Sequence, residues 1–216
     1  MSIEIHVFVA GPLETNTYLL TSGTTAWVID PAMGLDELIA VARQRGLDVR
    51  RVLLTHGHAD HIAGIPQLRR AWPGLKVACP RADAAMLTDP RANLSADFGL
   101  GITVGEADEL IDPGQVLRES DLELRVLDTA GHTAGGVSYY CPAAKVVFSG
   151  DSLLAGSIGR TDLPGGDYPR LIRDIRRNLL SLDDAVRVLP GHGPASTIAR
   201  ERRANPFLVG QAGGEG

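Results

Sequence analysis

Three histidines and one aspartate lie within the six positions from His56 to His61, directly after the apolar residues Val52-Leu53-Leu54. Neutral imidazoles contribute little to packing and charged ones repel each other, so few structural needs explain this crowding. Imidazole nitrogens and carboxylate oxygens are ligands that suit zinc, iron and similar divalent ions. The segment therefore predicts a buried strand that ends in a metal-binding loop.

Three more candidate ligands follow apolar runs further along the chain. They are His132 in Thr-Ala-Gly-His-Thr, Asp151 in Phe-Ser-Gly-Asp-Ser and His192 in Pro-Gly-His-Gly. The glycine beside each of them lets the backbone turn sharply where the apolar run ends. With the first segment they make five histidines and two aspartates, which is enough for two metal ions. We therefore interpret the chain as an enzyme with a dinuclear metal centre, built at the ends of several strands.

Composition limits the other properties of the chain. Its 216 residues, 44% of them hydrophobic and 22% charged, can bury a large core. We expect one domain over residues 1–209, followed by a disordered tail at 210–216. The net charge of −5 argues against a nucleic-acid partner. We also expect a cytoplasmic protein, because the sequence has neither a secretion signal nor an apolar stretch of about 20 residues that would cross a membrane.

Periodicity predicts the order of the elements. Strands are expected over residues 3–9, 17–20, 26–30, 52–54, 76–78, 122–127, 136–140, 146–149 and 186–189, and helices over 35–45, 61–71, 81–87 and 167–180. The aperiodic segment 89–105, rich in glycine and proline, predicts a loop that covers a site. This order indicates an α/β protein with two sheets face to face and helices outside them.

The motifs also resemble those of a known family. Thr55-His56-Gly57-His58-Ala59-Asp60-His61, followed by His132, Asp151 and His192, resembles the metallo-β-lactamase superfamily. Within it, Gly-Arg-Thr-Asp-Leu-Pro-Gly-Gly-Asp at 159–167 and Pro-Gly-His-Gly-Pro at 190–194 look like the glyoxalase II (hydroxyacylglutathione hydrolase) branch, as do Asn-Leu-Ser at 93–95 and residues 202–207. The resemblance extends from about Ile5 to Leu208. It implies an αββα sandwich of two mixed β-sheets with helices on the outer faces.

The resemblance further implies how the ligands are divided. One ion would be held by His56, His58 and His132, the other by Asp60, His61 and His192, with Asp151 bridging the two. Asp60 and Asp151 would also orient the nucleophile and are therefore the expected catalytic residues. Zinc is the expected metal, and iron or manganese suits the same ligands.

The activity implied by the resemblance is hydrolysis of a thioester such as S-lactoylglutathione, with a metal-bound hydroxide attacking the carbonyl. Asn93 and Arg160 are the expected substrate contacts, the partner is a small molecule, and the chain acts as a monomer or homodimer. Full-length members carry a C-terminal helical region that helps to bind glutathione, and a tyrosine where this chain has Gly193-Pro194. We therefore expect weaker binding of glutathione thioesters and tolerance of other thioesters.

Several alternatives stay open at this stage. A glutathione persulfide dioxygenase of the same superfamily would hold one iron with His56, His132 and Asp151. Lactonases and β-lactamases use the same core, and a metal-binding module without catalysis is a further class. Asp30 either caps a turn or holds the histidine loop from behind. The Arg160 side chain either pairs with Asp162 to brace its loop or contacts substrate.

Overall fold

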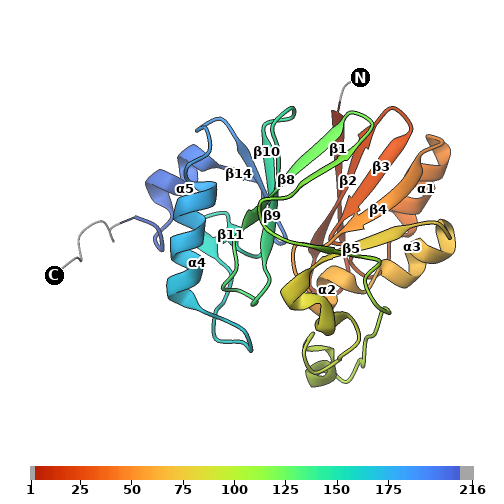
Figure 1. The fold of residues 1–216 in the computed structure, drawn as a ribbon, viewed down its shortest axis with the longest axis horizontal. Coiled ribbons are helices and arrows are strands. Elements are labelled where there is room, and N and C mark those ends of the chain that lie inside the picture. The colour runs from red at the N-terminus through yellow and green to blue at the C-terminus, as the bar shows by residue number, and fades with distance from the viewer. Residues whose placement is uncertain (1–2, 210–216) are drawn as a thin grey trace.

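The computed structural model describes residues 3–209, which form two β-sheets packed face to face between helices (Figure 1). The first sheet has the order β1 (Ile3–Ala10), β2 (Thr15–Ser22), β3 (Thr25–Ile29), β4 (Asp48–Leu53), β5 (Lys76–Pro80) and β6 (Glu109–Ile111). Strands β1 to β3 pair antiparallel, whereas β3 to β6 pair parallel. The expected tail at 210–216 lies outside the described residues.

The second sheet is mixed as well. Its order is β14 (Ser196–Thr197), β13 (Arg187–Pro190), β10 (Val146–Gly150), β9 (Val137–Cys141), β8 (Leu122–Asp128) and β7 (Val116–Glu119). Only β10 and β13 pair parallel in this sheet. The small hairpin of β11 (Leu153–Leu154) and β12 (Ser157–Ile158) follows β10.

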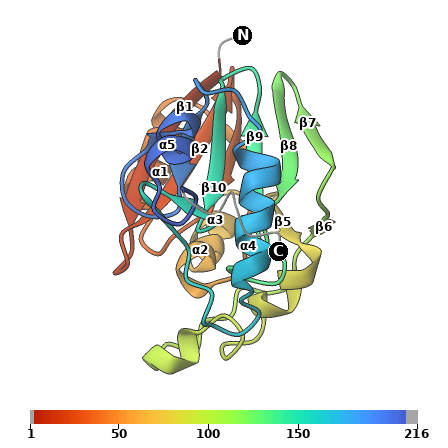
Figure 2. The same ribbon diagram turned by 90° about the vertical axis from the view of Figure 1, so that its left-hand side faces the viewer.

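Helices cover the outer face of each sheet. The first sheet is covered by α1 (Asp36–Gln44) and α3 (Ile65–Ala71), and the second by α4 (Tyr168–Asp174) and α5 (Ile198–Ala204), which face the viewer in Figure 2. A π-helical turn, η3 (Ile175–Leu179), continues α4. The remaining helices are the short α2 (Ala59–Ile62) and the 3-10 helices η1 (Arg81–Leu87) and η2 (Ser95–Phe98). The predicted αββα sandwich is therefore confirmed.

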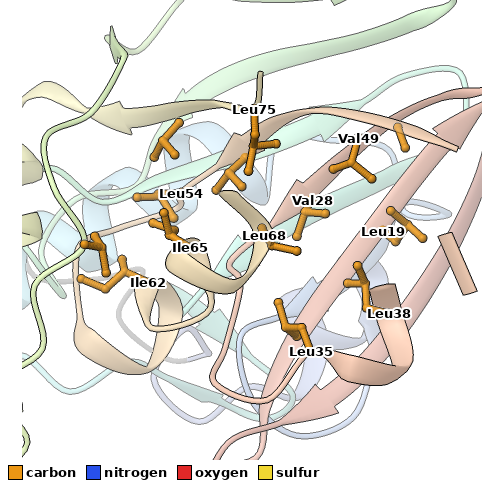
Figure 3. Close-up of a cluster of buried hydrophobic side chains, with 14 of the residues drawn as sticks. Leu19, Val28, Leu35, Leu38, Val49, Leu54, Ile62, Ile65, Leu68 and Leu75 are labelled. Atoms are coloured by element: carbon orange, nitrogen blue, oxygen red, sulfur yellow. The ribbon is translucent and has the colours of Figure 1, made fainter. Parts of the chain in front are cut away.

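Strand alternation divides the buried side chains into three hydrophobic layers. One lies under α1 and α3 and contains Leu19, Val28, Leu38 and Leu68 (Figure 3). The layer between the sheets contains Trp27, Ile29, Tyr139 and Phe148. The third lies under α4 and η3 and contains Val147, Leu171, Ile175 and Val188. Neighbouring residues of one strand, such as Val28 and Ile29, thus serve different layers.

The predicted helix over 61–71 is wrong in one respect, because the chain breaks it into α2 and α3. The break lies at Gly64, whose amide donates to the carbonyl of Pro31 at 2.8 Å. A Cβ at this position would collide with the backbone carbonyl of Ala32. Pro66 then lies in the first turn of α3, where a missing amide is tolerated. Close packing of two backbones therefore ends the first helix.

Two short strands, β6 and β7, were not predicted from the pattern. The first has three residues, and the second alternates exposed and half-buried positions at the edge of its sheet. The predicted helix at 81–87 is a 3-10 helix, and the one at 167–180 ends in a π-helical turn. Both cysteines, Cys79 and Cys141, are buried free thiols. Among residues 3–209 there is no helix with the length and apolarity needed to span a membrane.

Phe148 offers a test of the layer between the sheets. Its ring is fully buried and packs edge-on against Tyr18, with ring centroids 5.1 Å apart. Phe148→Ala should lower the free energy of unfolding by about 3–5 kcal/mol, because it removes buried surface and leaves a cavity. Val9→Ala, at a position 62% exposed, should change it by less than about 0.5 kcal/mol. Urea unfolding of both variants measures the difference, and equal stabilities would contradict the packing described here.

Candidate metal centre

The seven predicted ligands meet at one edge of the sandwich. His56 follows β4 of the first sheet, whereas the other three loops follow β8, β10 and β13 of the second. Asp60 and His61 lie on α2, which starts directly after the histidine loop. Since the two sheets contribute from opposite sides, the site lies where their strand ends converge.

One set of ligand atoms has the spacing of a tetrahedral metal site. Nε2 of His61 lies 3.3 Å from Oδ2 of Asp60, and Nε2 of His192 lies 3.1 Å from the same oxygen. The two imidazole nitrogens are 3.4 Å apart. Metal–ligand bonds of about 2.0–2.2 Å in a tetrahedron place ligand atoms about 3.3–3.6 Å apart. The three distances fit one ion at the centre of this set.

His56, His58 and His132 form a second set on the other side. Their rings approach each other almost perpendicularly, with centroids 4.7 to 5.0 Å apart. Each offers one ligand atom within 4.8 Å of the others. Nδ1 of His58 lies 2.9 Å from Nε2 of His132, and Nε2 of His56 is buried without a hydrogen-bond partner. An unpartnered nitrogen in such a place is unfavourable unless a cation binds it.

Asp151 lies between the two sets. Its Oδ1 is 3.5 Å from Nε2 of His61, and its Oδ2 is 3.7 Å from Nε2 of His132 and 3.6 Å from Nε2 of His192. Oδ1 is buried and accepts no hydrogen bond among the described residues. A carboxylate with a free buried oxygen, facing imidazoles of both sets, has the position that a bridging ligand needs.

The far nitrogens of four imidazoles are held by the protein. Nδ1 of His56 lies 3.0 Å from Oγ1 of Thr55, and Nδ1 of His61 lies 3.0 Å from Oδ2 of Asp30. Nδ1 of His132 contacts the carbonyl of Arg160 at 2.7 Å, and Nδ1 of His192 contacts that of Leu13 at 3.0 Å. These contacts fix the ring orientations, so that Nε2 points to the centre in each case. Metal-binding histidines characteristically have such support.

Asp30 holds the histidine loop from behind. Its carboxylate accepts hydrogen bonds from the amide of Thr55 at 2.7 Å and from the hydroxyl of Thr55 at 2.6 Å, besides its contact with His61. Its oxygens also lie close enough to His56 and His61 for a common ion. Because Thr55 engages both oxygens, we assign Asp30 a positioning role. Of the two alternatives for Asp30, the structure therefore favours the one in which its side chain holds the histidine loop in place.

The electrostatics differ between the two sets. Burial, together with neighbouring imidazoles, lowers the pKa of His58 to about 3 and that of His56 well below its usual value. Burial also lowers the pKa of His61, but Asp60, Asp151 and Asp30 outweigh it and hold the pKa well above its usual value. His56 and His58 are thus neutral, as ligation requires, whereas the carboxylates around His61 stabilise positive charge. Both properties suit the binding of cations.

Two glycines allow the ligand loops to approach closely. A Cβ at Gly191 would collide with Oδ1 of Asp151 and with the ring of His61. Gly150 has a φ of +49°, and a Cβ there would collide with the side chain of Thr55. Both positions therefore require glycine for the sheets to bring their ligands together.

The two predicted substrate contacts have different surroundings. The amide nitrogen of Asn93 donates to the carbonyls of Met86 at 2.8 Å and Ile102 at 2.9 Å, and its oxygen accepts from the amide of Ser95 at 3.0 Å. This fully buried side chain therefore holds its own loop in shape. Arg160 borders the cavity beside the metal centre, and its guanidinium binds Asp162 through two contacts of 2.8 Å. That pair is the bracing arrangement expected as one alternative.

Asp83 is a site residue that the sequence reasoning missed. Its buried carboxylate accepts from the amide of Gly57 at 3.2 Å, from the hydroxyl of Thr133 at 2.6 Å and from the amide of Gly135 at 2.7 Å. It thereby joins the His56 loop to the His132 loop. The pattern gave no separate signal, because Asp83 is a single acidic residue among alanines in a short helix. Asn16 was missed too, and it holds the His192 loop through the carbonyls of Pro190 and Gly193.

Comparison with known proteins agrees with this geometry. Residues 10–192 match the family model described as the metallo-beta-lactamase superfamily. The chain belongs to the metallo-β-lactamase superfamily.

Relatives of similar length within the superfamily include named hydrolases. A probable metallo-hydrolase, YqgX, from Bacillus subtilis is 37% identical over 93% of this chain and 95% of its own length. Hydroxyacylglutathione hydrolase GloC from Haemophilus influenzae is 36% identical over 85% of this chain and 87% of its own length. The similarity to both extends over most of each protein.

Solved structures with the metallo-β-lactamase fold are also similar. The BLEG-1 B3 metallo-beta-lactamase has a TM-score of 0.91 and 35% identity, over 96% of this chain and all of its own. TTHA1623 in a di-iron-bound form has a TM-score of 0.81 and 36% identity, over 94% of this chain and 100% of its own. ETHE1 from Myxococcus xanthus has a TM-score of 0.79 and 28% identity, over 94% and 83% respectively.

Removal of the Asp83 carboxylate should lower both the stability of the protein and its hold on metal, because Asp83 joins two of the ligand loops. Asp83→Ala leaves three buried donors without their acceptor, which predicts a loss of about 2–4 kcal/mol in the free energy of unfolding and faster loss of metal to a chelator. Asp112→Ala is the matched control, because Asp112 forms an exposed pair with Arg81 and its loss should leave the unfolding curve close to that of the unaltered protein. Urea unfolding and metal-release rates measure both effects. Identical curves for the two variants would exclude the proposed role of Asp83.

Proposed function

We propose that this chain is a dinuclear metal-dependent hydrolase that cleaves thioesters. The observation that carries the proposal is the pair of ligand sets, His56–His58–His132 and Asp60–His61–His192, with Asp151 between them. The similarity to a hydroxyacylglutathione hydrolase supports a thioester as substrate. The similar structure of TTHA1623, described in a di-iron-bound form, supports the assignment of two ions. For this chain we favour zinc as the metal.

When bound, two divalent ions would supply a water of lowered pKa and would polarise the substrate carbonyl. The side chains of the protein hold the reacting groups. Asp60 accepts a hydrogen bond from the hydroxyl of Thr15 at 3.0 Å, which fixes the carboxylate beside His192. Asp151 is in a position to orient the nucleophile between the sets. In the net reaction the oxygen of water joins the carbonyl carbon, the C–S bond breaks, and a carboxylate, a thiol and a proton result.

A mononuclear iron dioxygenase is the second candidate, because its two histidines and one aspartate would be His56, His132 and Asp151. The observation against it is the set of Asp60, His61 and His192, whose ligand atoms lie 3.1 to 3.4 Å apart. With a single iron at the first set, the ligand atoms of Asp60, His61 and His192 would bind no ion, although their spacing fits one. We therefore favour hydrolysis.

The similarity to a chain described as a B3 metallo-beta-lactamase adds a further candidate reaction on the same site. Hydrolysis of a β-lactam or a lactone also joins water to a carbonyl carbon and breaks the bond to a leaving nitrogen or oxygen. A β-lactam and a lactone therefore accompany S-lactoylglutathione as assay substrates. Faster turnover of either one than of every thioester tested would overturn the thioester assignment while retaining the metal-dependent hydrolase.

Asp151→Ala tests the bridging position. The variant should lose affinity for both ions together and lower kcat by on the order of a hundredfold or more, since Asp151 contacts both ligand sets. Asp112→Ala is the control and should keep both ions. Metal analysis after dialysis, with a thioester assay, gives the result. Two ions per chain retained in Asp151→Ala would contradict the bridge.

His192→Ala separates the two functions. In a dinuclear hydrolase it should release the ion of the second set, retain that of the first and lower thioester turnover by at least about tenfold. In a dioxygenase, iron binding and oxygen uptake with glutathione persulfide should persist. Metal stoichiometry and an oxygen electrode distinguish these outcomes, and one iron per chain with oxygen uptake in the unaltered protein would overturn the hydrolase.

A further inference from the structure

The metal centre forms one end of a cavity whose remaining walls are mostly apolar. The cavity has a volume of about 520 Å³, which is in the range of small-molecule sites. His58, Asp60, His132, Asp151 and His192 line one end. The apolar wall contains Pro12, Leu13, Met33, Phe98, Leu100 and Leu163. A molecule that reaches the metal centre is therefore in contact with this wall.

Several of these apolar side chains are unusually exposed to water. Phe98 is 68% exposed, Leu100 56%, Leu13 52% and Met33 43%. They come from three separate segments, which are the turn after β1, the loop after β3 and the loop around η2. Large apolar side chains gathered around a cavity indicate a surface that a ligand covers. The continuity with the metal centre identifies this ligand as the substrate.

The charges of the cavity argue against a highly charged occupant. Among the described residues that line it, Arg160 is the one lysine or arginine, and Asp162 engages its guanidinium twice. The glutathione group carries two carboxylates and an ammonium, which require charged or strongly hydrogen-bonding partners when desolvated. The wall around Phe98 and Leu100 contains no charged side chain, and the polar groups of Asn93 and Ser95, which also line the cavity, are engaged by the protein itself. An apolar group on the substrate would instead cover this wall and remove it from water.

We infer that the preferred substrate is a thioester with an apolar acyl chain, which lies along Leu13, Met33, Phe98 and Leu100 while its carbonyl reaches the metal centre. The inference rests on the proposed function and specifies its substrate class. The bond changes are those of thioester hydrolysis, so that the products are a fatty carboxylate and a thiol. The loop 93–102 sets acyl specificity, and Asn93 holds that loop in shape through its three hydrogen bonds.

The first experiment compares acyl chains on one small uncharged thiol. Full-length zinc-loaded protein is assayed with acetyl, butyryl and hexanoyl thioesters of N-acetylcysteamine, and with S-lactoylglutathione. The value of kcat/KM should rise about threefold for each methylene added, because each one removes apolar surface from water. The value of kcat/KM for the hexanoyl thioester should exceed that for S-lactoylglutathione. Equal values along the series, or a preference for S-lactoylglutathione over every apolar chain, would overturn the inference.

Phe98→Ala locates the effect, with Phe207→Ala as the matched control. Phe207 is an exposed phenylalanine, 39% accessible, that does not line the cavity. Phe98→Ala should lower kcat/KM for the hexanoyl thioester about fivefold to tenfold, with a smaller loss for shorter chains. Phe207→Ala should match the unaltered protein. Equal effects of both substitutions would exclude the proposed acyl wall.

Binding of carboxylates separates this inference from the proposed reaction. Calorimetry with acetate, butyrate and hexanoate measures the apolar wall without any turnover, and affinity should rise with chain length in zinc-loaded protein. If affinity rises but no thioester is hydrolysed, the thioester function is overturned, and the apolar substrate class stands for another hydrolytic reaction. If thioesters are hydrolysed but neither turnover nor affinity depends on chain length, the function stands and the apolar substrate class is overturned.

Discussion

Two buried carboxylates hold the ligand loops of this protein in place. Asp30, at the end of β3, binds the amide and hydroxyl of Thr55 and the ring of His61. Asp83, after β5, joins Gly57 to Thr133 and Gly135 across the two sheets. Seven ionisable ligands converge at this edge, and their mutual positions depend on these contacts. Support of this kind fixes ligand geometry through rigid elements and not through the ion alone.

Local patterns predicted the sandwich and singled out side chains that the fold brings together at one edge. Strand periodicity and the placement of His56, His132, Asp151 and His192 after apolar runs are properties of short segments, so they are legible without a structure. The family resemblance contributed the expected division of the ligands between two ions. Distances between the ligands required the fold, because the contacts join residues far apart in the chain, such as Asp60 and His192.

The misses have the same physical origin. The break at Gly64 depends on the approach of Pro31 and Ala32, which no helical pattern contains. The role of Asp83 depends on loops that come together from different sheets. In each case the structural role of the residue depends on contacts with segments that are distant in the sequence.

Chemistry and specificity come from different parts of the molecule. The ligands follow strand ends of two packed sheets, where small shifts are resisted by three hydrophobic layers. The apolar wall comes from the turn after β1, the loop after β3, the loop around η2 and Leu163 after β12, and none of its residues is a proposed ligand. On the proposed substrate assignment, substitutions in that wall would alter which acyl group fits while the ligand geometry stays unchanged. This separation explains physically how one fold includes chains described both as a hydroxyacylglutathione hydrolase and as a β-lactamase.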